Sequence, residues 1–163
     1  MSASAEPDAH VLITRFQLQP HPEGGWYREW HRSGLTVTRQ DGASRSGLTT
    51  ILFLLEGQQP SRWHQVSGAD EAWLFLDGAP LELFSLPPSG GTPERQLLHA
   101  PLRDPAAAPM AVVPAGWWQA ARSLGAWSLV SCAVGPGFSF DDFRLLRELP
   151  APRRPMGASE AFL

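Results

Sequence analysis

The stretch that decides the fold of this chain runs from Gly57 to Gly78 and reads GQQPSRWHQVSGADEAWLFLDG. It contains His64 and then Glu71, and the residues on either side have the composition of β-strands. A histidine and a glutamate on neighbouring strands can point into one cavity, where they bind a metal ion or act as an acid/base pair. By strand alternation, the residues on the same face as Glu71 are Trp73, Phe75 and Asp77.

The composition is that of a globular protein rich in turns. The chain has 163 residues, of which 43% are hydrophobic and 18% charged, so we expect one domain with a substantial core. Its 15 glycines and 16 prolines favour many short strands over long helices. We expect three parts: a disordered N-terminus over residues 1–10, a single domain over 11–149 and a loose, proline-rich tail over 150–163.

Charge and sequence pattern argue against several classes of partner. A formal net charge of −3 without a basic cluster argues against nucleic acid, and no apolar run is long enough to span a membrane. The opening MSASAEPDAH lacks the basic start and apolar middle of a signal peptide. The single cysteine, Cys132, excludes an internal disulfide, and we expect it to be a small buried hydrophobe. These features predict a cytoplasmic protein whose partner is a small molecule.

Other elements follow from caps, turns and alternation. Asp8 can cap a short helix that ends at about Phe16, and Ser139 can cap another from Phe140 to about Arg147. The polar segment 34–47 is expected to be a loop or a hairpin. Strands are expected at 26–31, 49–55, 81–85, 94–100, 110–113 and 126–134.

The central stretch resembles the first sequence motif of the cupin superfamily, in which a histidine is followed by a glutamate and then a glycine. His64, Glu71 and Gly78 stand at these positions. The segment PAGWWQ at 114–119 resembles the second motif, Pro-x-Gly-x-x-His, with Gln119 where the last histidine ligand usually stands. The segments 20–34 (PHPEGGWYREWHRSG) and 132–143 (CAVGPGFSFDDF) resemble a narrower group, the small cupins catalogued as a domain of unknown function (cupin type 5).

This resemblance covers roughly residues 11–149 and implies an all-β fold. The expected architecture is the double-stranded β-helix, or jelly-roll (RmlC-like) barrel, with short N- and C-terminal helices. The resemblance also implies a homodimer that forms through sheet edges and exposed aromatic side chains. It does not bring an activity with it, because cupins host many chemistries.

The metal ligands that the resemblance implies are incomplete in this sequence. The usual motif carries two histidines one residue apart, but the positions on either side of His64 are Arg62 and Val66. The remaining candidates for a divalent ion (Fe, Zn, Mn or Ni) are His64, Glu71 and Gln119. One imidazole, one carboxylate and one amide make a poor iron or zinc site, so we favour a site that requires no cofactor.

Without a metal, His64 and Glu71 are the candidate catalytic pair, because histidine titrates near neutral pH. If Arg62 also faces inward, it can clamp a carboxylate or phosphate with two hydrogen bonds. A satisfied buried salt-bridge network is the structural alternative for these residues. The further candidates for binding a substrate are Gln119, Trp73, Trp117, Tyr27, Glu23 and Thr50.

Three functions remain open at this point. The first is an enzyme that moves protons, such as an isomerase, epimerase or lyase, on a small polar, carbohydrate-like or carboxylate-bearing metabolite. The second is a non-catalytic protein that binds such a metabolite in the same pocket. The third is a metal-dependent, dioxygenase-like cupin, against which the missing histidines count.

Overall fold

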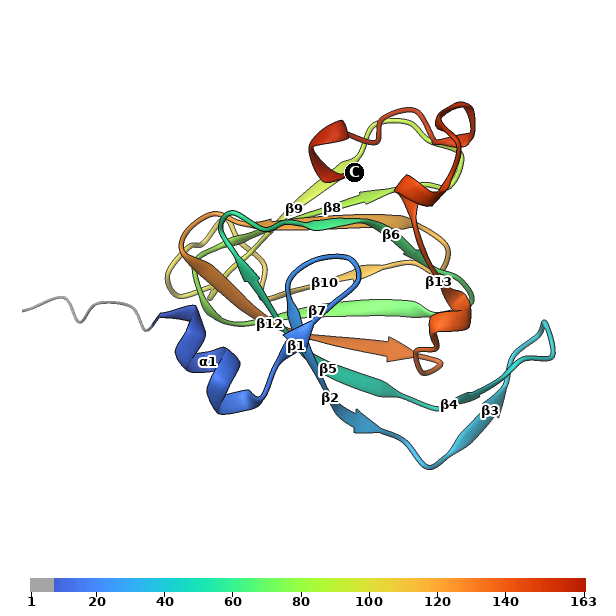
Figure 1. Cartoon of the computed structure of the whole chain (residues 1–163), viewed down its shortest axis with the longest axis horizontal. Helices are drawn as coiled ribbons and strands as arrows, with labels where there is room; N and C mark the ends of the chain where they lie inside the picture. Colours follow the sequence, from blue (N-terminus) through green and yellow to red (C-terminus); the bar gives the residue numbers. More distant parts are fainter. Residues whose placement is uncertain (1–7) are drawn as a thin grey trace, which may run out of the picture.

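The chain is built almost entirely from short β-strands in the computed structural model, which describes residues 8–163 (Figure 1). The only α-helix in that range, α1 (Ala9–Phe16), precedes the strands. The strands are β1 (Gln19–Pro20), β2 (Trp26–Arg32), β3 (Thr36–Thr38), β4 (Ser44–Ser46), β5 (Thr49–Glu56), β6 (Ser61–Val66), β7 (Asp70–Gly78), β8 (Leu81–Leu86), β9 (Glu94–Leu98), β10 (Met110–Val113), β11 (Trp118–Ser123), β12 (Trp127–Gly135) and β13 (Phe143–Leu145). The 3-10 helices are η1 (Phe140–Asp142), η2 (Leu146–Glu148), η3 (Ala151–Arg153) and η4 (Glu160–Phe162).

Two antiparallel sheets face each other and enclose the main core (Figure 1). The larger sheet has the strand order β1-β2-β5-β12-β7-β10, and the smaller has the order β13-β6-β11-β8-β9. Strands β3 and β4 pair only with each other and form a hairpin that projects from the ends of β2 and β5. This arrangement confirms the all-β, antiparallel architecture. Of the two possibilities expected for residues 34–47, a loop or a hairpin, the structure has the hairpin.

Strand β5 lies within the larger sheet and is covered on both faces, which explains its continuous apolar sequence. Phe53 and Leu55 project into the core between the sheets, where they pack with Trp73 and Val130. Leu54 projects to the opposite face, where it packs with residues at the start and just after the end of α1.

Helix α1 begins where the capping residue predicts. The carboxylate of Asp8 accepts the backbone N–H of His10 at 3.1 Å, and Gln17 ends the helix in the left-handed conformation with φ of 53°. The disorder that we expected for residues 1–10 therefore does not extend to Ala9 and His10. Residues 1–7 lie outside the described residues.

The helix expected from Phe140 to about Arg147 is wrong, and so is the C-terminal helix of the expected architecture. Ser139 does cap a turn, but this is the single 3-10 turn η1. The chain then extends as β13 and pairs with β6, so that Leu145 lies opposite His64. Without β13 the edge of β6 would be unpaired, and backbone pairing outweighs the local helical spacing.

The tail after Pro150, expected to be loose, packs against the outer face of the smaller sheet. Phe162 is buried in an apolar cluster with Trp63 and Trp118. The indole N–H of Trp63 donates to the backbone carbonyl of Ser159 at 3.1 Å. Strand alternation directs these tryptophans away from the core between the sheets, so the tail covers apolar surface that would otherwise face water.

The other expected strands form close to their expected limits, the largest difference being β9, which ends at Leu98 rather than at residue 100. Neighbouring residues of β11 have opposite orientations, since Trp118 packs in the outer apolar cluster and Gln119 in the core between the sheets. Among residues 8–163, no helix has the length and apolar character needed to cross a membrane.

Candidate functional site

A cavity of about 560 Å³ lies between the two sheets and opens beside the β3–β4 hairpin. Its exposed mouth includes Glu29 and Arg32 from β2, Ser44 from the hairpin and Phe140 from η1. Its buried end carries a group of polar side chains that we call the inner cluster: His21, Glu23, His64, Glu71 and Cys132.

Strand alternation brings the two expected catalytic candidates to the cavity. His64 and Val66 project from one face of β6 into the cavity, whereas Trp63 projects from the other face into the outer cluster. Glu71 projects from β7 in the facing sheet. Both candidate side chains are almost fully buried, with exposed fractions of 2% for His64 and 7% for Glu71.

Glu23 lies at the centre of the inner cluster. Its Oε2 atom is 3.2 Å from Nε2 of His64 and 3.3 Å from Nδ1 of His21. Its Oε1 atom accepts a hydrogen bond from the Ser61 hydroxyl at 2.9 Å. Glu23 therefore contacts three polar side chains at the buried end of the cavity.

Glycine at position 24 allows the loop that carries Glu23 to approach β6. Gly24 has φ of 106°, and a Cβ atom on it would lie 2.5 Å from the carbonyl oxygen of Pro60. Only glycine adopts this conformation so close to another backbone. The backbone N–H of Arg62 then donates to the carbonyl of Glu23 at 2.8 Å, which holds the loop against the strand.

The hydrogen-bond partners of the two imidazoles determine where their protons lie. Nδ1 of His64 is 2.8 Å from the carbonyl oxygen of Arg62, which only accepts, so Nδ1 carries the proton and Nε2 presents a lone pair to Glu23. Nδ1 of His21 accepts the backbone N–H of Glu23 at 3.3 Å, so it also presents a lone pair. The lone pair of His64 thus faces Oε2 of Glu23, which is favourable when that oxygen carries a proton, whereas the lone pair of His21 is occupied by the backbone N–H of Glu23.

Burial favours the neutral form of each of these groups. Burial raises the pKa of Glu23 well above its ordinary value, and the nearby carboxyl of Glu71 raises it further. Burial lowers the pKa of His64 to about 4, and it lowers the pKa of His21 to about 3 with a contribution from His64. Burial thus favours a neutral carboxyl at Glu23 beside two neutral imidazoles.

Glu71, the second carboxyl of the inner cluster, has a different environment. Burial raises its pKa to about 7, and hydrogen bonds from Gln119 and Cys132 oppose this rise. The amide Nε2 of Gln119 donates to Oε2 of Glu71 at 2.5 Å. Burial therefore favours the protonated form of both carboxyls, and at Glu71 the donors Gln119 and Cys132 favour the ionised form.

Of the seven side chains expected to bind a substrate, Glu23 and Tyr27 line the cavity and Arg62 does not. The Arg62 side chain instead lies next to Gly24, on the loop that follows β1. The clamp for an anion that Arg62 was expected to supply is therefore not present at the buried end of the cavity.

The remaining four expected residues lie in the core or on the wrong face of a strand. Trp73 belongs to the core between the sheets and Trp117 packs against it. Gln119 is 1% exposed and contacts Glu71 from behind the cavity wall. Thr49 lines the cavity and Thr50 does not, because alternation in β5 directs neighbouring residues to opposite faces.

The sequence pattern does not predict that Arg32 lines the cavity, because a β-bulge turns it there. The pairing of β2 with β5 shifts between Glu29 and His31, so Arg32 lies opposite Thr49 and on the cavity side. Its guanidinium binds Glu29 at 2.8 Å and 2.9 Å. His31 is exposed, as expected for a surface residue. No pattern in the local sequence predicts a bulge, so strict alternation along β2 places Arg32 on the face away from the cavity.

His21 was also not predicted. It lies in the turn that carries Glu23, where the backbone N–H of Gly24 donates to the carbonyl of His21 at 3.0 Å. This turn, rather than strand alternation, brings both side chains to the cavity, so no periodic pattern in the sequence reveals it. Cys132 is buried as expected, and it also lines the cavity.

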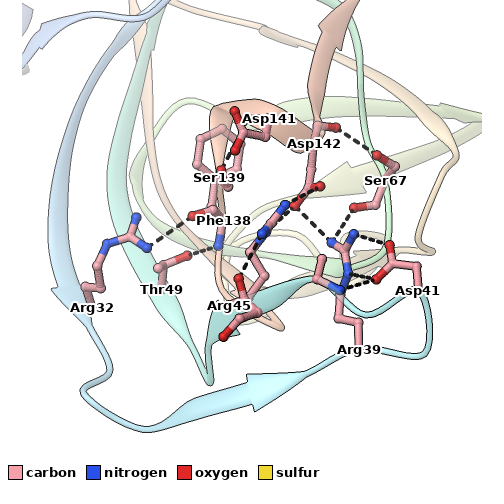
Figure 2. A network of polar contacts seen from close by, with 12 residues as sticks. Arg32, Arg39, Asp41, Arg45, Thr49, Ser67, Phe138, Ser139, Asp141 and Asp142 are labelled. Atoms are coloured by element: carbon pink, nitrogen blue, oxygen red, sulfur yellow. Dashed lines mark hydrogen bonds and ion pairs between the residues drawn. The ribbon is translucent and has the colours of Figure 1, made fainter.

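A polar network joins the β3–β4 hairpin to η1 at the mouth of the cavity (Figure 2). Asp142 accepts hydrogen bonds from Arg45 at 2.8 Å and 2.9 Å and from Arg39 at 2.9 Å. Arg39 also binds Asp41 within the hairpin. Arg45 and Arg39 hold the pKa of Asp142 below its ordinary value. Both arginines that line the cavity, Arg32 and Arg45, are thus already paired with carboxylates.

The residues do not fit the metal site that the resemblance implies. The indole N–H of Trp73 donates at 2.8 Å to Oε1 of Gln119, the one atom of that side chain able to bind a metal ion. An indole N–H only donates, so the amide oxygen faces Trp73 and the amide nitrogen faces Glu71. Within residues 8–163, no three His, Cys, Asp or Glu side chains are arranged to hold a metal ion.

The two sheets, the cavity between them and the motif residues inside it define a cupin. The sequence model of the family described as "Cupin superfamily (DUF985)" matches residues 10–146, and the chain belongs to this family. The expected fold and the expected narrower group are both confirmed.

Two solved structures of similar length support this membership. A hypothetical protein from Leishmania major is 32% identical, with a TM-score of 0.77 over 85% of this chain and 86% of that one. Protein SO0799 from Shewanella oneidensis is 33% identical, with a TM-score of 0.76 over 85% of this chain and 84% of that one.

More distant similarity extends to larger proteins and concerns the fold alone. The oxalate decarboxylase of Lactobacillus farciminis is 19% identical, with a TM-score of 0.54 over 82% of this chain and 36% of that one. No curated protein matches this chain.

Proposed function

We propose that this cupin is an enzyme that moves protons on a small polar, carbohydrate-like substrate, as isomerases, epimerases and lyases do. The observation that carries the proposal is the presence of two buried carboxyls, Glu23 and Glu71, in one cavity. Burial raises the pKa of both carboxyls, to about 7 at Glu71, and the nearby carboxyl of Glu71 raises the pKa of Glu23 further. Two carboxyls with perturbed pKa values in one cavity are typical of a catalytic acid/base site.

In this proposal Glu71 is the base. A pKa of about 7 leaves a large ionised fraction at neutral pH and still gives the carboxylate a high proton affinity. Glu23 is the acid, since its Oε2 carries the proton of the inner cluster. His64 stays in the machinery as the neighbour that exchanges this proton, because its Nε2 lone pair lies 3.2 Å from Oε2 of Glu23.

The lining supports a neutral polar substrate better than an anionic one. The buried end offers the carboxyl oxygens of Glu23 and Glu71 as hydrogen-bond acceptors, and both arginines that line the cavity are already paired with carboxylates at its mouth. Aromatic rings line the cavity as well, among them Phe53, Phe138 and Phe143. A carbohydrate-like compound has hydroxyl donors for the acceptors and an apolar C–H face for the rings.

We further propose that the reaction needs no metal cofactor. The reason is that the candidate ligands already have other partners. The Gln119 oxygen accepts a hydrogen bond from the indole N–H of Trp73, and Nε2 of His64 faces Glu23. The homodimer and the cytoplasmic location expected from the sequence stay predictions. Sedimentation equilibrium tests the first, and fractionation of cells tests the second.

Exchange of carbon-bound hydrogen in D₂O tests the proposed reaction. The protein is incubated with a panel of neutral sugars, polyols and sugar acids, and loss of C–H signals is followed by proton NMR. We expect loss for at least one neutral compound with wild type, and none with Glu71→Gln. Glu94→Gln, which changes an exposed glutamate on β9, is the matched control and should exchange like wild type.

Other outcomes of this experiment contradict the proposal. Compounds that raise the melting temperature without any exchange would indicate a binding protein with the same pocket. Exchange at the wild-type rate in Glu71→Gln would mean that the base is another residue.

A further inference from the structure

Two hydrogen bonds in sequence connect the core to the proposed base. The indole N–H of Trp73 donates to Oε1 of Gln119 at 2.8 Å, and Nε2 of Gln119 donates to Oε2 of Glu71 at 2.5 Å. Trp73 and Gln119 are each 1% exposed. These bonds therefore lie inside the protein, behind the wall of the cavity.

The connection spans both sheets. Trp73 and Glu71 are two residues apart on the same face of β7, in the larger sheet, and Gln119 reaches them from β11 in the smaller sheet. The amide thus bridges two side chains of one strand from the opposite side of the core. Movement of the Glu71 carboxyl would break its hydrogen bond to Gln119, whose amide is also held by Trp73.

The direction of these bonds determines which end of the amide meets Glu71. An indole nitrogen is a donor only, so it requires the amide oxygen, and the amide NH₂ group must then point at the carboxyl. A donor next to a carboxyl stabilises its ionised form. If the amide were reversed, its oxygen would face Glu71 and favour the protonated form instead.

We infer that Trp73 and Gln119 are positioning residues, which orient the carboxyl of Glu71 for the reaction through the hydrogen bond that the Gln119 amide donates to it. They take this role in place of binding substrate or metal. The catalytic meaning of the inference rests on the proposed function, whereas its electrostatic content can be measured on the protein alone. Burial by itself raises the pKa of Glu71, and the bond from Gln119 opposes this rise.

The test is the pKa of Glu71 in two variants, measured by NMR titration of protein with ¹³C-labelled glutamate carboxyls. The signal of Glu71 is assigned by its loss in Glu71→Gln. Trp73→Phe keeps an aromatic ring and removes the indole N–H. Gln119→Met keeps the length of the side chain and removes both the oxygen and the NH₂ group of the amide. We expect each to raise the pKa of Glu71 by on the order of one unit, the size of a lost hydrogen bond to a charged group.

Trp63→Phe is the matched control. It also removes a buried indole N–H, but this one donates to Ser159 on the outer face of the smaller sheet. We expect no change in the titration of Glu71. For any substrate found, the acidic limb of the pH–rate profile should move upward with the pKa in Trp73→Phe and Gln119→Met, because the base must be ionised.

The inference is overturned if the pKa of Glu71 stays at its wild-type value in the folded Gln119→Met protein. Gln119→Met decides the matter if Trp73→Phe does not fold, and Trp73→Phe decides it in the opposite case. Raised pKa values without any C–H exchange by wild type would support the positioning role and contradict the proposed function. Exchange by wild type with unchanged pKa values of Glu71 in the variants would support the proposed function and contradict the positioning role.

Discussion

Oε2 of Glu23 lies 3.2 Å from Nε2 of His64, and the other imidazole nitrogen of His64 is bound to the carbonyl of Arg62. The carboxyl of Glu23, whose pKa is raised by burial, therefore faces the nitrogen of His64 that carries a lone pair. In the proposed function, a proton on Glu23 passes to His64 across this contact.

Glu23→Gln should abolish proton transfer while leaving the fold intact. The amide has nearly the same shape and can still donate to Nε2 of His64, so we expect the free energy of unfolding to change by only about 1 kcal/mol. It cannot release a proton, so C–H exchange in D₂O should fall by at least about a hundredfold. Exchange within a few-fold of wild type would show that Glu23 is not the acid.

Glu71→Gln should change how stability depends on pH. Burial raises the pKa of Glu71 from 4.5 to about 7, so the folded state holds this proton more tightly than the unfolded chain. The contribution of Glu71 to stability is fully present below pH 4.5 and is lost as the pH rises through 7. In the variant this loss is absent, so its stability relative to wild type should increase by about 2–3 kcal/mol between pH 4.5 and pH 8.

Urea unfolding at several pH values measures this difference. The histidines act in the opposite direction, since a buried neutral imidazole with a pKa of about 4 loses stability as the pH falls from 6.5. Their contribution is common to wild type and Glu71→Gln, so it cancels in the comparison. A constant difference in stability across the range would contradict the raised pKa of Glu71.

Asp142→Asn should loosen the hairpin at the mouth of the cavity. The variant weakens the bonds that Arg39 and Arg45 make to the η1 turn (Figure 2). If the variant destabilises the hairpin held against η1 by about 1.4 kcal/mol relative to the released hairpin, the population with the hairpin released becomes about ten times larger. Cys132 is the only cysteine and lines the cavity, so its rate of reaction with a thiol reagent reports on access.

Glu82→Gln is the matched control for this experiment. Glu82 is also a buried carboxylate between two arginines, Arg95 and Arg122, but it lies on β8 and does not line the cavity. We expect faster labelling of Cys132 in Asp142→Asn only. Equal acceleration in both variants would indicate global destabilisation rather than opening of the mouth.

Elemental analysis should find well below one equivalent of iron, zinc, manganese or nickel in protein purified without an affinity tag or chelator. The reason is that the Gln119 oxygen is bound to Trp73, so the expected ligand set is incomplete. Chelator should leave the melting temperature unchanged. Near one equivalent of metal in wild type that is lost in His64→Ala would instead revive the metal-dependent alternative.

The sequence by itself determined most of the strands, but not β13, the bulge in β2 or the cavity-facing side of β5. The strand composition around His64 and Glu71 was sufficient to predict that both side chains can reach one cavity. The cupin motifs were sufficient to predict the family. Both kinds of information are local, because a strand's alternation depends only on its own residues.

Only the tertiary structure decided which groups meet inside the cavity. The contact of His21 and Glu23 with His64 joins segments that are far apart in the chain, and it depends on the close approach of Gly24 to Pro60. The orientation of the Gln119 amide depends on a donor from the opposite sheet. Likewise, β13 replaces the expected helix because the edge of β6 needs a partner. Such contacts depend on which strand lies beside which, and no pattern within a single strand records this.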